Sequence, residues 1–152
     1  MTTLETAVRE AVAAVCDPEY PDVTIRQLGI LEAVRVSEQG DAEVDLVPTV
    51  LGCPALGVIE ADVRAAALGA GAVVVAIRFL HSPAWSPGRI QADAAALLAR
   101  EYTIAIRLPA VALHCPLCGS DAVRMQSEFG PTPCRAVAWC SACRNPVEVI
   151  RR

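Results

Sequence analysis

Two Cys-x-x-Cys motifs near the C-terminal end constrain the fold of this chain more than any other feature of its sequence. Cys115 and Cys118 form the first motif, Cys140 and Cys143 form the second, and 21 residues separate the two. Each motif can wrap two thiolates around one ion, and two motifs on facing hairpins complete a tetrahedral site. The pattern therefore predicts a structural zinc site in a zinc ribbon, with a rubredoxin-like iron site as the alternative that uses the same ligands.

Composition predicts what accompanies this ribbon. The chain has 152 residues, of which 54% are hydrophobic, so it can bury a compact core and is expected to form one main domain plus a small appendage. We expect an α/β (α+β) domain over residues 1–110 and a four-cysteine zinc-ribbon domain over residues 111–152. Because the ribbon has few large apolar side chains, metal binding is expected to provide most of its folding free energy, on the order of 10 kcal/mol.

Hydrophobic periodicity and turn residues predict the elements of the first domain. Thr2 and Glu5 form a capping-box pattern at the start of a helix, and alternating apolar residues flank a turn further along the chain. The order of elements predicts a two-layer domain, with a small mixed sheet and helices against one face. The expected elements are a helix over 3–16, a β-hairpin around 38–41, a helix that begins at Pro54, a buried strand over 72–80 and a third helix over 89–101.

The charge pattern bears on the class of partner. The formal net charge is -4, and residues 1–112 hold 8 Arg against 14 Asp and Glu, without a basic block in the chain. Binding to a phosphate backbone needs many cationic contacts, so this pattern argues against nucleic acid as a partner. Apolar runs stay well short of the roughly 18 residues of a membrane span, and the first residues lack the composition of a signal peptide. We therefore expect a cytoplasmic protein whose cysteines stay reduced.

Cys53 lies between Gly52 and Pro54, far from the paired motifs. A strand is expected to end near Pro48 and a helix to begin near Pro54, which places Cys53 at or beside the helix N-cap. Unpaired amides and the helix dipole would favour a thiolate there, and a lowered pKa makes a cysteine nucleophilic or metal-binding. The alternative is that Cys53 is a small buried side chain that only packs.

Several of these motifs together resemble the MIP18 (DUF59) family, whose members assist the assembly of iron-sulfur proteins. The matching runs are Asp17-Pro18-Glu19-Tyr20-Pro21, Leu28-Gly29-Ile30, Gly52-Cys53-Pro54 and Ser82-Pro83-Ala84-Trp85. The tail is similar to the PaaD (PaaJ) family of accessory subunits of the bacterial phenylacetyl-CoA epoxidase system. Its matching runs are Cys115-Pro116-x-Cys118-Gly119-Ser120 and Ser127-x-Phe129-Gly130-x-Thr132-x-Cys134, followed by the second Cys-x-x-Cys motif.

The resemblance implies an accessory or maturation role in aerobic phenylacetate degradation, in which the chain assists the assembly of an iron or iron-sulfur centre. It implies the other epoxidase subunits or iron-sulfur assembly proteins as partners. Relatives of this size often self-associate, so the resemblance also allows a homo-oligomer. Cys53 is the candidate transient ligand of iron or of a cluster, with Asp17 and Glu19 as candidate helpers. The alternative role of these two acids is turn formation beside prolines.

The motifs that are missing limit what the chain can catalyse. The sequence contains no P-loop, no Gly-x-Ser-x-Gly run and no Glu-x-x-His pair of the diiron kind, so the chain is not expected to catalyse the oxygenation alone. Two other functions stay open: a non-catalytic docking subunit of the same complex, in which Cys53 only packs, and a thiol redox protein. Cys134 exceeds the four ligands of a tetrahedral site, so packing is the role expected for it.

Overall fold

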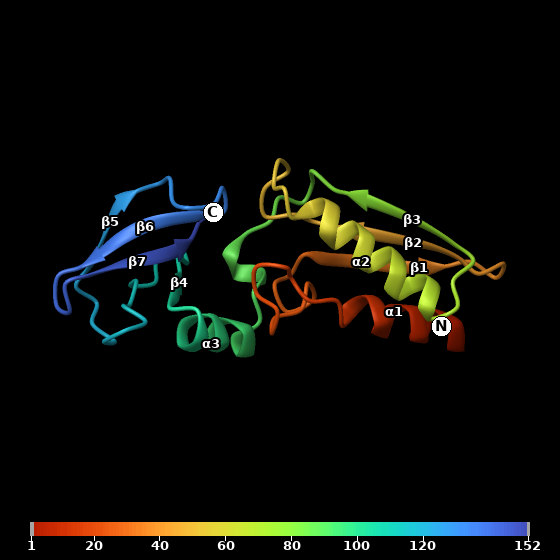
Figure 1. Cartoon of the computed structure of the whole chain (residues 1–152), viewed down its shortest axis with the longest axis horizontal. Coiled ribbons are helices and arrows are strands. Elements are labelled where there is room, and N and C mark those ends of the chain that lie inside the picture. Colours follow the sequence, from red (N-terminus) through yellow and green to blue (C-terminus); the bar gives the residue numbers. More distant parts are fainter. Residues whose placement is uncertain (1, 152) are drawn as a thin grey trace. The chain divides into compact units, whose positions relative to one another are not determined.

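The protein divides into two compact units, Met1–Trp85 and Ser86–Arg152, each of which is described by itself. The structure is a computed structural model and describes residues 2–151 (Figure 1). The expected boundary at residue 110 concerns domains that fold separately, and it stays a prediction. Among the helices of the described residues, none is long and apolar enough to cross a membrane.

The first unit is a three-stranded sheet packed against two helices. Strand β1 pairs with β2 in antiparallel fashion and β2 pairs with β3 in parallel, which confirms the expected small mixed sheet. Helix α1 packs against β1, helix α2 packs against β3, and the two helices contact each other. The bounds are α1 Thr3–Ala13, β1 Leu31–Val36, β2 Asp41–Leu46, α2 Leu56–Gly69 and β3 Val74–Phe79.

Helix α1 begins where the capping pattern predicts. The Thr2 side chain accepts a hydrogen bond of 3.1 Å from the Glu5 amide and so satisfies one of the unpaired donors at the helix start. The helix ends at Ala13, before the expected residue 16. The reason is a tertiary one, because Cys16 leaves the helical path to form an isolated β-bridge with Thr24.

Two other predicted elements differ from the structure. Helix α2 begins at Leu56 with Ala55 as its N-cap, not at Pro54, because tight turns hold the preceding residues: Cys53 N donates to Val50 O and Leu56 N donates to Cys53 O. The strand expected to be buried over 72–80 is instead an edge strand, β3, with every second residue exposed. Helices of the described chain cover only one face of this sheet, so an apolar sequence alone did not decide burial.

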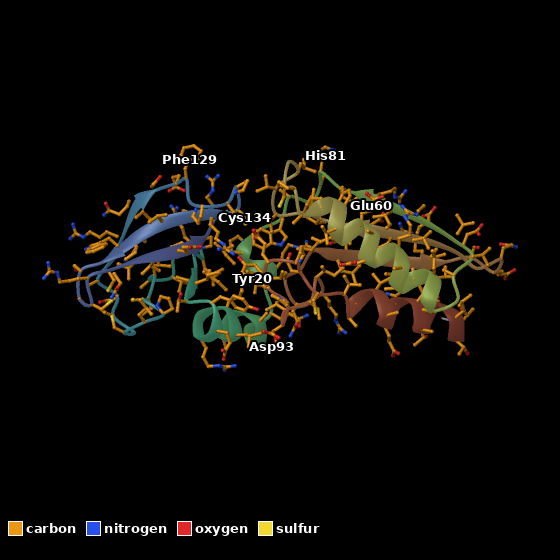
Figure 2. All side chains as sticks on the ribbon, viewed as in Figure 1. Tyr20, Glu60, His81, Asp93, Phe129 and Cys134 are labelled. Carbon is orange, nitrogen blue, oxygen red and sulfur yellow. The ribbon has the colours of Figure 1, made fainter. Side chains whose placement is uncertain are left out.

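The core of the first unit consists of large branched and aromatic side chains. Trp85 is buried and its Nε1 donates to the Leu28 carbonyl oxygen at 2.9 Å, and Tyr20 (Figure 2) is buried as well. Burial of so much apolar area is the main stabilising term of an ordinary domain. The large, fully buried side chains of this unit are Ile25, Leu46, Val8, Val12, Val23, Val44, Val47 and Val63.

The other face of the first sheet carries a network of ion pairs. Asp45 is only 6% exposed, and it lies between Arg35 on β1 and Arg78 on β3, which donates to its carboxylate at 2.8 Å. Hydrogen bonds from Arg78 hold the pKa of Asp45 below its usual range; burial opposes this shift and the hydrogen bond from Arg35 adds to it. Glu43 also pairs with both arginines. A buried charge at the middle of the sheet is thereby compensated.

The second unit contains a short helix and a four-stranded sheet of order β4-β7-β6-β5. Its first strand was not expected from the sequence: β4 pairs in parallel with β7, so residues before 111 complete the sheet of the ribbon. The third predicted helix is divided into a 3-10 turn and α3. The bounds are η1 Pro87–Arg89, α3 Ala92–Glu101, β4 Ile104–Ile106, β5 Val123–Ser127, β6 Arg135–Cys140 and β7 Asn145–Ile150.

Candidate functional site

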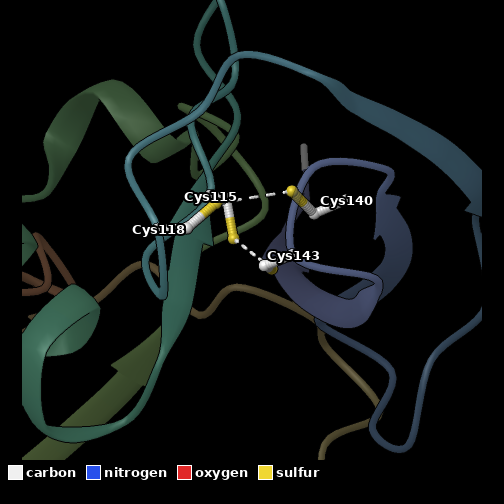
Figure 3. A group of neighbouring side chains, drawn as sticks. All are labelled: Cys115, Cys118, Cys140 and Cys143. Atoms are coloured by element: carbon white, nitrogen blue, oxygen red, sulfur yellow. Dashed lines mark hydrogen bonds between the residues drawn. The ribbon is translucent and has the colours of Figure 1, made fainter.

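The four cysteines of the paired motifs converge on one point in the second unit (Figure 3). Their sulfur atoms all lie within 4.8 Å of one another, with Cys115 and Cys143 3.7 Å apart and Cys118 and Cys140 3.6 Å apart. Four sulfurs around a zinc ion with bonds of about 2.3 Å form a tetrahedron with edges of about 3.8 Å. The donor set and its spacing therefore fit a single tetrahedral metal ion.

The same turn presents the cysteines in both motifs. Gly119 N donates to Cys115 O at 2.8 Å, and Arg144 N donates to Cys140 O at 2.9 Å. Both donors have a positive φ, 75° for Gly119 and 59° for Arg144. Each turn folds its two thiols toward the same side, and the antiparallel pairing of the strands brings the two turns together.

The residue two positions after each motif shifts the pKa of the last thiol of that motif, Ser120 through its backbone and Asn145 through its side chain. The hydrogen bond with the Asn145 side chain lowers the pKa of Cys143 to about 7; the hydrogen bonds of the other three thiols add to this effect and burial opposes it. The Ser120 backbone lowers the pKa of Cys118, but burial and hydrogen bonds with the other thiols outweigh it and raise that pKa to about 11. The four thiols cannot all ionise together near neutral pH unless a cation compensates them.

Sequence reasoning missed Ser120 and Asn145. The effect of Ser120 comes from its backbone, which any residue would supply, so no sequence pattern could have indicated it. The effect of Asn145 comes from its side chain, and an asparagine two positions after Cys143 was the signal available in the sequence.

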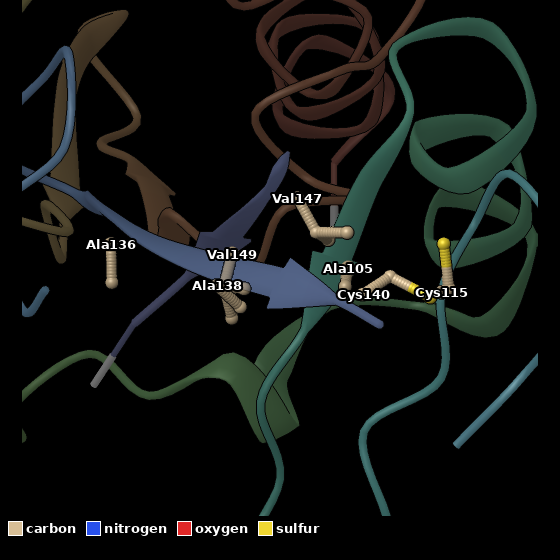
Figure 4. Close-up of a cluster of buried hydrophobic side chains, with 7 residues drawn as sticks. All are labelled: Ala105, Cys115, Ala136, Ala138, Cys140, Val147 and Val149. Atoms are coloured by element: carbon tan, nitrogen blue, oxygen red, sulfur yellow. The ribbon is translucent and has the colours of Figure 1, made fainter. Parts of the chain in front are cut away.

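Next to this site lies a small core (the ribbon core) made of alanine, valine and cysteine side chains (Figure 4). Two of its buried members, Cys115 and Cys140, are also members of the four-cysteine cluster. An apolar core of such small side chains provides little burial per residue, so the metal-binding groups are part of what fills it. Its buried residues are Ala105, Cys115, Ala136, Ala138, Cys140, Val147 and Val149.

Cys53 lies in the loop between β2 and α2 of the first unit and is partly exposed. The N-cap of α2 is Ala55, two positions after Cys53, so the expected location of Cys53 at or beside the N-cap is wrong. A tight turn, closed by the hydrogen bond from Leu56 N to Cys53 O, lies between Cys53 and the helix. Gly52 next to it lies outside the left-handed backbone region, and a Cβ there would meet no atom within 4 Å. Neither backbone angle nor internal packing requires a glycine beside Cys53.

The two acids proposed as helpers of Cys53 occupy a turn of their own. Asp17 is 7% exposed, its Oδ1 accepts a hydrogen bond of 2.8 Å from the Glu19 amide, and its carbonyl accepts one of 3.1 Å from Tyr20. This geometry corresponds to the turn-forming alternative. Within residues 2–151, the four-cysteine cluster is the only group of three or more Cys, His, Asp or Glu side chains close enough to hold a metal, so these acids do not converge with Cys53.

The remaining cysteines lie outside the metal cluster. Cys134 is buried, and its sulfur lies 3.3 Å from the Thr132 hydroxyl, directly before β6. Cys16 is partly buried three residues after the end of α1, and all seven cysteines are free of disulfide bonds. The structure therefore separates the thiols into four that converge in the second unit and three that lie outside this cluster.

Comparison with known proteins agrees with both resemblances. Residues 100–151 match the model of the PaaD zinc beta ribbon domain, and residues 5–79 match that of an iron-sulfur cluster assembly protein. A relative in Escherichia coli (strain K12), provisionally named as one of the subunits of 1,2-phenylacetyl-CoA epoxidase, is 33% identical over 144 residues, which cover 89% of this chain and 85% of the relative.

Solved structures resemble this chain over part of its length. A DUF59 domain of unknown function from Bacillus anthracis has a TM-score of 0.54 and 29% identity, and the match covers 60% of this chain and 87% of that one. A conserved hypothetical protein from Thermotoga maritima has a TM-score of 0.51 and 24% identity, covering 61% of this chain and 89% of that one. The second likeness concerns the fold alone.

Proposed function

Because this chain belongs to the PaaD family of 1,2-phenylacetyl-CoA epoxidase subunits, we propose that it is an accessory subunit of such an oxygenase system and assists assembly of its iron or iron-sulfur centre. The order of domains supports this proposal, since a segment that matches iron-sulfur assembly proteins precedes a ribbon of the PaaD type. The partners in this proposal are the other subunits of the epoxidase or iron-sulfur assembly proteins.

The observation that carries the proposal is the setting of Cys53. Cys53 is partly exposed on a loop of the first unit. The space beside it is open, because a Cβ on the neighbouring Gly52 would meet no atom within 4 Å. A thiolate that must accept and release iron or a cluster needs this kind of access, whereas a structural cysteine is buried and inert. Asp17 and Glu19 are held in a separate turn, so the remaining ligands of the cargo would come from the partner.

In the same proposal the ribbon holds zinc through Cys115, Cys118, Cys140 and Cys143. Four thiolates close the coordination shell, so the ion would stabilise the fold and leave no position for a substrate. The ribbon and Cys53 thus have different tasks, one structural and one concerned with cargo.

Replacement of the Cys53 thiol tests the proposal. We expect Cys53→Ser, produced together with the oxygenase subunits, to lower the iron content of the purified oxygenase severalfold, because the transient ligand is lost. Cys16→Ser is the matched control, since Cys16 is another partly buried thiol of the same unit. A fully iron-loaded oxygenase from cells with the Cys53 variant would refute the proposed cargo role.

A second candidate function is that of a docking subunit without cargo chemistry. One observation favours it: within residues 2–151, Cys53 belongs to no group of three or more side chains that could hold a metal ion together. In this case Cys53→Ser leaves the iron content of the oxygenase unchanged, whereas loss of the whole chain impairs the oxygenase. A thiol redox function has less support, because both Cys-x-x-Cys pairs belong to the four-sulfur cluster.

A further inference from the structure

The loop that joins β5 to β6 is tightly fixed although it takes no part in the metal cluster. A Cβ on Gly130 would lie 2.8 Å from the backbone oxygen of Arg135, so only glycine allows this close approach. Arg135 N donates to Thr132 O at 3.1 Å, and the Arg151 side chain donates to Pro133 O at 3.1 Å. These contacts hold the loop in one shape.

This fixed loop presents a phenylalanine to solvent. Phe129 is 80% exposed and Figure 2 shows its side chain projecting outward from the loop. The guanidinium of Arg151 lies over the ring, 5.4 Å from its centroid. An aromatic ring and an arginine held in place on a surface are the side chains that most often dominate the binding energy of a protein interface.

A cavity of about 730 Å³ in the second unit adjoins this pair, since Arg151 lines it and also contacts the Phe129 ring. Pro87, Leu108 and Pro109 supply its apolar wall, and the charged groups at its edge are Arg107, Glu128 and Arg151. The cavity could therefore take an apolar side chain with a charged group beside it.

The charged residues at the cavity favour an occupant with a negative charge. Arg107 pairs with Glu128 at 2.9 Å, whereas Arg151 has no carboxylate partner within residues 2–151. Residues 86–152 hold 8 Arg against 5 Asp and Glu, a net charge of +3, while residues 1–85 hold 5 Arg against 12, a net charge of -7. The unit that contains the cavity thus has a net positive charge, and Arg151 beside the cavity complements an acidic segment.

We propose that Phe129, Arg151 and the adjoining cavity (the Phe129 surface) bind a segment of a partner protein that carries a carboxylate next to an apolar side chain. The apolar side chain enters the cavity against Leu108 and the two prolines, and the carboxylate pairs with Arg151. The choice of partner rests on the proposed function: the segment belongs to another subunit of the epoxidase.

Binding of the purified epoxidase subunits to the full chain, measured by calorimetry, tests this surface. Phe129→Ala is expected to weaken binding about tenfold, because it removes the central apolar contact. Arg151→Glu is expected to weaken binding by a similar factor. In this variant the affinity should no longer fall when salt is added, because the screened ion pair is gone. Trp139→Ala is the matched control: Trp139 is an exposed aromatic residue, 40% accessible, near the other end of β6, and its loss should leave affinity unchanged.

The outcomes separate the surface from the function. If the wild-type chain binds and both Phe129 and Arg151 variants bind equally well, the surface is wrong while the accessory role stands. If the wild-type chain binds none of the subunits, both are wrong. If sedimentation shows that the chain alone self-associates and that Phe129→Ala abolishes this, the occupant is a second copy of the chain, which overturns the assignment to an epoxidase partner. Zinc content of every variant verifies that the ribbon is folded.

Discussion

The first unit and the ribbon core differ in the side chains that they bury. The first unit buries isoleucine, leucine, valine and tryptophan side chains, whereas the ribbon core consists of alanines, valines and two cysteines. Apolar burial is sufficient for the former, but a core of such small side chains needs a further stabilising interaction. The cysteines of the two places differ in burial: Cys115 and Cys140 belong to the ribbon core, whereas Cys53 is partly exposed on a loop of the first unit.

The largest difference should follow loss of a metal ligand. We expect Cys140→Ser to unfold the ribbon, because binding of a structural metal contributes on the order of 10 kcal/mol to such a segment. The first unit should keep its own thermal transition. In a Trp139→Phe background Trp85 is the only tryptophan, so its fluorescence reports on the first unit alone, while circular dichroism records both.

Cys134→Ser is the control for this experiment, since Cys134 is a buried cysteine outside the cluster. It should cost far less and leave the zinc content unchanged. If the two variants had equal effects, burial of the thiol and not metal binding would stabilise the ribbon.

Truncation of a core residue in the first unit should have an intermediate effect. Leu46 is fully buried in β2, and Leu46→Ala is expected to lower the free energy of unfolding of this unit by about 3 kcal/mol through lost burial and the cavity left behind. Urea unfolding followed through Trp85 measures it. The loss should be the same with and without a chelator, and a dependence on the chelator would contradict the separate origins of stability.

The smallest effect is electrostatic and depends on pH. The arginines hold the pKa of Asp45 below its usual range, so the folded state gains stability from the ionised carboxylate above the unfolded pKa of about 3.9 and loses it as pH falls further. Asp45→Asn should cost about 1 kcal/mol at pH 7, because solvent screens the two half-exposed arginines.

Unfolding of the first unit at pH 7 and near pH 3, again through Trp85, checks this sign. The difference between wild type and Asp45→Asn should shrink at the lower pH. A difference that stays constant would mean that Asp45 acts through its shape and not through its charge.

Local chemistry made part of this structure predictable. The Thr2 cap, the hairpin and the spacing of the four cysteines depend on residues close together in sequence, and the family resemblances were confirmed. Pairing of β4 with β7 joins segments about forty residues apart, which no local pattern records. The start of α2 was misplaced for a related reason, since turns around Cys53 compete with the helix that Pro54 would favour.

Exposure was the property that sequence predicted least well. The apolar run around Val74 was expected to be buried, yet Val74 is 57% exposed at the edge of the sheet. Phe129 is an apolar residue of a matched motif, and nothing in the amino-acid sequence indicates that its ring faces solvent. Burial is decided by which faces the tertiary structure covers, and functional surfaces are exceptions to the average pattern.

Metal content after anaerobic exposure to ferrous iron shows whether the two kinds of cysteine have separate tasks. Zinc and iron would be measured together in the complexes that the wild-type chain, Cys53→Ser and Cys140→Ser each form with the epoxidase subunits, because the remaining ligands of the cargo are expected from the partner. We expect the complex with Cys53→Ser to keep its zinc but to hold less iron than the wild-type complex, whereas Cys140→Ser loses zinc. Iron that persists in the Cys53 variant and displaces zinc from the ribbon would mean that the two tasks are not separate.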